Sequence, residues 1–137
     1  GGAKNIYAIN CKMNSPELDR VLRIKTSSSR GGIIENIFMK NIKVGTYKDA
    51  AIHVNMFYEK PGNFIPTVRN IWVEDLVVEK GGDYGIFINA YKQSPVQNLT
   101  LVNCNIKGVK VATKMDYFTN IVLKNVLVND KVLTIEK

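Results

Sequence analysis

Apolar residues recur at fixed positions in five nine-residue segments, which begin at Asn5, Asn36, Asn70, Asn98 and Asn120. Positions 2, 4, 7 and 9 are apolar in every segment, and position 6 is Asn or Asp. Positions 2 and 4 alternate as in a short strand with one buried face, and positions 7 and 9 resume this alternation. Position 6 interrupts it with a residue that tolerates the left-handed conformation of a sharp bend. Each segment is therefore predicted to be strand, one-residue bend and strand.

A third apolar strand is expected in each interval between these segments. The segments start 31, 34, 28 and 22 residues apart, and polar turns separate the strands. A coil of short strands recurring at such intervals predicts an all-β fold, a parallel β-helix of about five coils. Coils stack at about 4.8 Å, and the Asn residues of positions 1 and 6 would form hydrogen-bonded ladders along the stack. These strands are expected at residues 21–26, 51–58, 85–91 and 109–114, and a further strand, residues 132–137, follows the last segment.

Two other folds also contain regularly spaced apolar strands. An antiparallel β-sandwich has strands at this spacing, but it does not explain an Asn at a fixed offset in every segment. Leucine-rich repeats are disfavoured because no interval shows a sustained amphipathic helix. The parallel β-helix is therefore the preferred fold.

The charge of the 137-residue chain favours a polyanionic partner. Nineteen Lys and Arg residues against 12 Asp and Glu give a formal charge of +7, which suits nucleic acid, anionic lipid or an acidic polysaccharide. No run of 18 apolar residues occurs, so a transmembrane helix is excluded and no membrane partner is expected. Nucleic acid is disfavoured because the chain has no basic recognition helix and no recognisable nucleic-acid motif.

Cysteine and histidine are too scarce for a metal site built from them. The chain has one His and two Cys, and we expect neither a metal nor another cofactor. Cys11 and Cys104 both stand at position 7, in the first and fourth segments. Three coil spacings, about 14 Å, would separate them, which is beyond disulfide reach. Both are predicted to be free thiols in the core.

The third strands are predicted to present one continuous outward surface. Arg23 and Lys25 are two residues apart on a strand, so they point to the same side and can converge on one carboxylate. In the ordinary alternative, these cations and the lone His53 are solvated surface residues. The alternation places Val109 and Val111 inward. Outward positions are assigned to Arg23, Lys25, His53, Asn55, Phe87, Asn89 and Lys110, with Tyr58 and Tyr91 at strand ends.

Residues 20–26 and the following Ser-Ser-Ser-Arg-Gly-Gly-Ile-Ile-Glu-Asn-Ile resemble the polygalacturonases, glycoside hydrolase family 28. These are right-handed parallel β-helix enzymes that cut pectin, and their fourth signature, Arg-Ile-Lys, is matched by Arg23, Ile24 and Lys25. Residues 51–58 align with a family strand that ends in Tyr. The resemblance implies that Arg23 and Lys25 bind a galacturonate carboxylate and that Tyr58 contacts the sugar. We add His53 and Asn55 to this binding set from strand alternation.

Three earlier signatures of the family, Asn-Thr-Asp, Asp-Asp and Gly-His-Gly, do not occur in the sequence. In the family, their aspartates supply the general acid and the base of inverting hydrolysis, which needs two carboxyl groups about 6.5–9.5 Å apart. We therefore assign no catalytic residue to this chain and expect it to be inactive alone. Residues 1–137 are expected to be a single β-helix segment, the C-terminal part of a larger catalytic domain that hydrolyses α-1,4-galacturonan by inversion.

The resemblance also implies an acidic polysaccharide, galacturonan, as partner and a secreted or periplasmic location. An exposed first coil would leave a strand edge open to self-association.

Two alternative functions remain. One is a non-catalytic β-helix segment of an adhesin or tail-fibre protein. The other is a pectate lyase, which would need clustered carboxylates for calcium, and the sequence shows no such cluster.

Overall fold

The computed structural model describes residues 2–26, 31–57 and 62–135. These residues form ten strands and no helix, and therefore no helix that is long and apolar enough to cross a membrane. The long strands, with β10, form one sheet in the order β1-β3-β5-β7-β9-β10, and the short strands form the other in the order β2-β4-β6-β8. The long strands are β1 (Gly2–Met13), β3 (Ile33–Thr46), β5 (Thr67–Lys80), β7 (Val96–Ile106) and β9 (Phe118–Val128). The short strands are β2 (Arg20–Lys25), β4 (Ala50–Asn55), β6 (Tyr84–Asn89) and β8 (Val111–Asp116), and β10 is Lys131–Val132.

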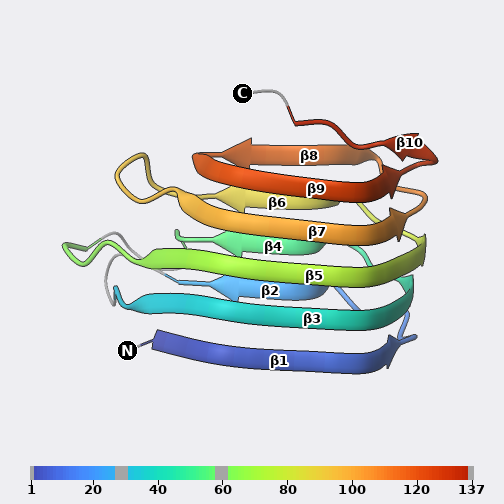
Figure 1. Cartoon of the computed structure of the whole chain (residues 1–137), viewed down its shortest axis with the longest axis horizontal. Coiled ribbons are helices and arrows are strands. Elements are labelled where there is room, and N and C mark those ends of the chain that lie inside the picture. The colour runs from blue at the N-terminus through green and yellow to red at the C-terminus, as the bar shows by residue number, and fades with distance from the viewer. Residues whose placement is uncertain (1, 27–30, 58–61, 136–137) are drawn as a thin grey trace.

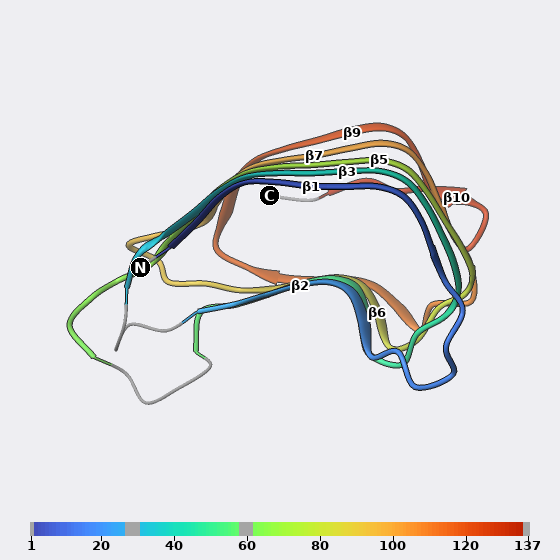
Figure 2. The ribbon, with the colours of Figure 1, turned by 90° about the horizontal axis from the view of Figure 1, so that it is seen from below.

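The strands stack as a parallel β-helix, as predicted. Each long strand pairs in parallel with the long strand of the next coil, and each short strand does the same with the next short strand. The long strands lie one above another in chain order, with the short strands behind them (Figure 1). Viewed from below, the long and short strands enclose a common interior (Figure 2).

The described residues make about four turns rather than the predicted five coils. Five long strands are stacked in the part of the chain that the structure describes, but only four short strands complete their turns. Residues 132–137 were predicted as a last parallel strand, but their described part, residues 132–135, does not continue the helix. Instead β10 folds back antiparallel on β9, with Val132 opposite Leu127.

Every long strand bends twice. Positive φ angles occur at position 6 of each segment, as predicted, and also at position 1, where the sequence pattern predicts only a ladder. The bends give each long strand the three straight parts that are visible in Figure 2. Asn and Asp allow this because their short polar side chains stabilise left-handed backbone. The ten bend residues are Asn5, Asn10, Asn36, Asn41, Asn70, Asp75, Asn98, Asn103, Asn120 and Asn125.

The predicted Asn ladders are present. At position 1, each Nδ2 donates to Oδ1 of the preceding coil, at 3.0, 3.1, 3.0 and 2.6 Å from Asn5 to Asn120. At position 6, Asn41 donates to Asn10 at 2.7 Å and Asn125 to Asn103 at 3.0 Å. Asp75 stands between these two pairs, and its carboxylate has no N–H to donate.

The interior is filled by the apolar positions of the repeat. Ile42, Val54 and Leu99 are fully buried, at 1% exposure or less. Both cysteines are free, as predicted; Cys104 is buried, whereas Cys11, in the first coil, is only partly covered. Burial raises the pKa of the Cys104 thiol to about 11. Among the described residues, no group of three or more His, Cys, Asp or Glu side chains could hold a metal ion.

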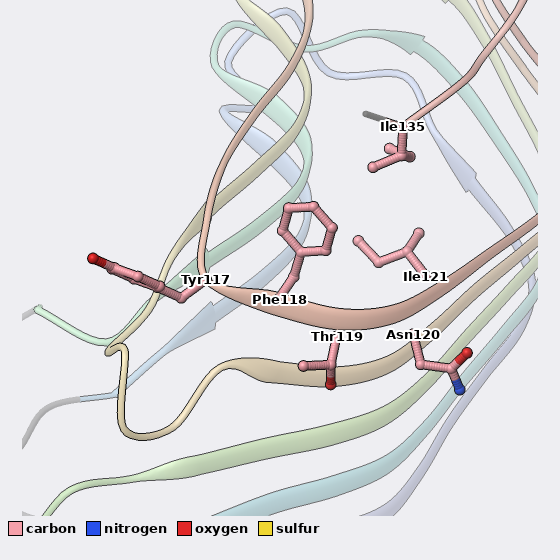
Figure 3. Close-up of a pocket in the computed structure, with 6 residues that line it drawn as sticks. All are labelled: Tyr117, Phe118, Thr119, Asn120, Ile121 and Ile135. Atoms are coloured by element: carbon pink, nitrogen blue, oxygen red, sulfur yellow. The ribbon is translucent and has the colours of Figure 1, made fainter. Parts of the chain in front are cut away.

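A pocket of about 450 Å³ lies at the C-terminal end of this interior. Figure 3 shows Phe118, Ile121 and Ile135 pointing into it, while Thr119 and Asn120 point to the outside. The pocket is thus the end of the apolar core, where Ile135 lies over the last coil. It is lined by Tyr117, Phe118, Thr119, Asn120, Ile121 and Ile135.

The prediction for the fourth short strand is wrong in its register. β8 begins at Val111 instead of residue 109, and Val111 is 47% exposed instead of inward. Val109 is buried, but it packs inward from the preceding turn, where Gly108 has a φ of 70°. The Asn129 side chain fixes that turn by bonding the N–H and the carbonyl of Val109, at 2.9 and 2.7 Å. The inward positions of β8 are therefore Thr113 and Met115, in register with inward residues of β6.

Candidate functional site

The outward side chains of the short sheet form two rows across its four described strands, because the strands pair in parallel and in register. We call them the first row and the second row. The first row consists of Arg23, His53, Phe87 and Lys114. The second row consists of Lys25, Asn55, Asn89 and Asp116. The rows bring together four predicted site residues, Arg23, Lys25, His53 and Asn55.

Strand alternation places Arg23 and Lys25 at one end of these rows. Ile24, between them, is 4% exposed and packs in the core, whereas its two neighbours are exposed. Arg23 and Lys25 therefore point to the same side of β2, as the sequence pattern predicts. This geometry allows both cations to approach one anionic group. Their role in binding stays a prediction.

His53 differs from the solvated surface residue that its outward position predicts. It is only 6% exposed, because its ring stacks on Phe87 with centroids 4.8 Å apart and planes within 6°. Nε2 of His53 lies 3.8 Å from Oδ2 of Asp49, and Nδ1 is buried without a hydrogen-bond partner among the described residues. Burial lowers the pKa of His53 below 6.5, and the charges of Arg20 and Arg23 lower it further. His53 is therefore mainly neutral at neutral pH.

An ion pair beside His53 is absent from the sequence prediction. Nη2 of Arg20 lies 2.6 Å from Oδ2 of Asp49, and both side chains are largely covered. Arg20 begins β2 and Asp49 directly precedes β4, so adjacent coils bring the two residues together. The signal could have been found, because Arg20 and Asp49 stand one and two residues before predicted short strands of adjacent coils. The pair compensates the carboxylate charge next to Arg23.

The ends of the short strands carry an amide and an aromatic pair. Oδ1 of Asn55 accepts a hydrogen bond from the backbone N–H of Phe57 at 2.9 Å, so this oxygen stabilises the turn after β4. The rings of Phe57 and Tyr91 lie 4.3 Å apart and are inclined by 37°. Tyr58, the remaining predicted site residue, lies outside the described residues.

The shifted register of β8 changes the far end of both rows. The prediction that Lys110 faces outward in the row is wrong: Lys110 lies in the turn, with Nζ 3.2 Å from Oδ1 of Asp83. Lys114 takes that place in the first row, and its Nζ lies 5.8 Å from the centre of the Phe87 ring. Asp116 ends the second row and brings a carboxylate to a face on which the sequence pattern predicts none.

The parallel β-helix carries Arg23 and Lys25 on β2, the two cations on which the resemblance to glycoside hydrolase family 28 depends. The family model described as glycosyl hydrolases family 28 matches residues 2–129. The chain belongs to glycosyl hydrolase family 28. The resemblance found in the sequence is thus confirmed, and membership of family 28 implies a polysaccharide substrate. No curated protein and no solved structure matches the chain.

Proposed function

We propose that the outward face of the short sheet binds the carboxylate of galacturonan, as part of a polygalacturonase-like, inverting glycoside hydrolase. The observation that carries this proposal is the placement of Arg23 and Lys25, exposed on one side of β2 at the start of the two rows. Arg presents a planar fork of donors that matches a carboxylate, and Lys adds a point charge beside it.

Local electrostatics supports an anionic ligand at this end of the face. Oδ2 of Asp49 lies 3.8 Å from Nε2 of His53, and Nη2 of Arg20 compensates its charge at 2.6 Å. His53 is mainly neutral, because burial lowers its pKa. Arg23 and Lys25 both bring a positive charge to this end of the face. An acidic sugar is attracted to it, and salt weakens the attraction.

We propose that catalysis itself requires carboxylates that these residues do not supply. The family resemblance assigns the acid and the base to three signatures, and none of them occurs in this sequence. The chain alone should therefore bind galacturonan without hydrolysing it. We also propose a secreted or periplasmic location, in keeping with a pectin substrate.

The binding proposal can be tested by titrating the chain with hexagalacturonate in a calorimeter. Arg23→Ala and Lys25→Ala should each weaken binding by about tenfold or more, because each removes a charged hydrogen bond. Lys124→Ala is the matched control, since Lys124 is exposed on the long strand β9. Equal affinities for all these variants would refute the proposed site.

A separate assay tests the proposed lack of catalysis. The pure chain is incubated with polygalacturonate, and the release of reducing ends is measured. We expect none above a buffer control. Sustained release that Arg23→Ala abolishes would show that the chain carries its own catalytic carboxylates, and the assignment of catalysis to the absent signatures would then be wrong.

A further inference from the structure

Lys114 places a second cation in line with Arg23, at the far end of the first row. The two residues are separated by three strand spacings of the short sheet, about 14 Å. Lys114 is exposed, and no carboxylate of the described residues forms an ion pair with it. Its Nζ lies 5.8 Å from the centre of the Phe87 ring. The charge of Lys114 is therefore available to a ligand.

The residues between the two cations form a continuous stack. One face of the Phe87 ring is covered by His53, and Lys114 lies over the ring from the next strand. The stacked His53 and Phe87 rings thus lie between the two cations of the first row. Asn89, in the neighbouring row, adds an amide beside these rings.

We propose that Lys114 binds a second carboxylate of the acidic sugar chain, on a sugar unit different from the one held by Arg23. This inference rests on the proposed function. A galacturonan chain that runs along the solenoid axis carries a carboxylate on every unit, so its repeat can serve both cations at once. Two linked contacts on one ligand act together, because the second forms at a high effective concentration.

Asp116 defines where the second carboxylate lies. It is two residues after Lys114, so both side chains leave the same face of β8. A ligand carboxylate next to Asp116 would be repelled, and the anion is therefore held on the Lys114 side. The Asp116 carboxylate instead accepts hydrogen bonds from sugar hydroxyl groups.

The experiment compares trigalacturonate with hexagalacturonate by calorimetric titration of the full chain. The outer carboxylates of the trisaccharide are only two sugar repeats apart, whereas those of the hexasaccharide are five repeats apart and can reach both ends of the first row. Lys114→Gln should weaken hexagalacturonate binding by about threefold to tenfold, as expected for a partly solvated ion pair. It should leave trigalacturonate binding unchanged. The matched control Lys124→Gln removes the same charge from the other sheet and should change neither affinity.

A fully methyl-esterified hexagalacturonate adds a chemical control, since it carries no carboxylate. An equal loss of affinity for the ester and the acid in Lys114→Gln would overturn the proposed carboxylate contact. So would a loss that is equal for the trisaccharide and the hexasaccharide. If hexagalacturonate binding depends on Arg23 but not on Lys114, this inference fails and the proposed function stands. If hexagalacturonate does not bind at all, both fail.

Discussion

Nδ2 of Asn36 donates a hydrogen bond to Oδ1 of Asn5 at 3.0 Å, and every later step of this ladder runs in the same direction. Each residue therefore accepts from the following coil and donates to the preceding one. The ladder is polar as a consequence: its N-terminal end presents the Asn5 amide donor, and its C-terminal end presents the Asn120 acceptor. Among the described residues, neither of these terminal groups has a ladder partner.

Asn70→Ala should destabilise the chain. Asn70 has a φ of 60° and takes part in two ladder bonds, one as donor and one as acceptor. Alanine loses both bonds and is strained in left-handed backbone, so we expect the free energy of unfolding to fall by about 1–3 kcal/mol. Urea denaturation measures this change.

Asn70→Gly separates the effect of backbone strain from that of the lost hydrogen bonds. Glycine adopts positive φ without strain but has no side-chain amide. Its loss of stability should be smaller than that of the Ala variant. Equal losses for the two variants would mean that the backbone conformation contributes nothing and that the hydrogen bonds account for the whole effect.

Asp75→Asn should stabilise the chain. At φ 55°, Asp75 already has the bend conformation of the ladder residues, so the substitution requires no backbone change. A new Nδ2 group could donate to Asn41, which would extend the ladder of position 6 by one step. We expect a gain of about 0.5–1.5 kcal/mol in the free energy of unfolding, as for one added hydrogen bond. A lower stability in urea denaturation would contradict a ladder role for this position.

The edge of β1 should support self-association of this chain. In the described structure β1 pairs only with β3, and Ile6 is 45% exposed although its counterpart in the next coil, Ile37, is 5% exposed. An unpaired strand edge beside exposed core residues is a template for another strand. Ladder polarity disfavours two N-terminal ends meeting, because amide donors would face donors. Sedimentation velocity should therefore show association that increases with protein concentration.

Ile6→Asp should shift this equilibrium towards the monomer, because it puts a charge on the exposed end of the core. Ile9→Asp is the matched control: Ile9 is 50% exposed, but it pairs with Lys40 on the outward face. A wild-type chain that stays monomeric at every concentration would argue against an adhesive edge, as would an equal response of both variants.

The ladders and the core could be predicted from the sequence because they repeat. Asn at position 1 and an apolar residue at position 2 recur in every segment, so one coil defines the environment of the next. The bend at position 1 could not be predicted in this way. Asn5 and its equivalents precede an apolar strand residue, and nothing in the alternation distinguishes a bent residue there from an extended one.

The far end of the candidate site could not be predicted, because it depends on a tertiary contact between residues far apart in the sequence. The register of β8 depends on Asn129, which bonds Val109 from 20 residues away, and this contact leaves no pattern around Val109 itself. The position of Lys114 in the first row was therefore not predicted. The burial of His53 has a similar origin, since it depends on Phe87 in the next coil and not on the alternation within β4.

His53 should make the stability of the chain depend on pH in the mildly acidic range. Burial, followed by the charge of Arg20, lowers the pKa of His53 in the folded chain below 6.5, although Asp49 opposes this shift. The folded state thus binds this proton less tightly than the unfolded state, and stability is lost as pH falls below 6.5 towards the folded pKa.

We expect the free energy of unfolding to decrease between about pH 7 and pH 5, a range above the titration of ordinary carboxylates. His53→Phe removes the titrating group but keeps an aromatic ring to stack on Phe87. Its unfolding free energy should therefore change less over the same range, and its advantage over the wild type should grow as the pH falls. Parallel pH profiles for the two proteins would show that His53 is protonated equally well in the folded and unfolded chains, and that its buried position against Phe87 has no electrostatic consequence.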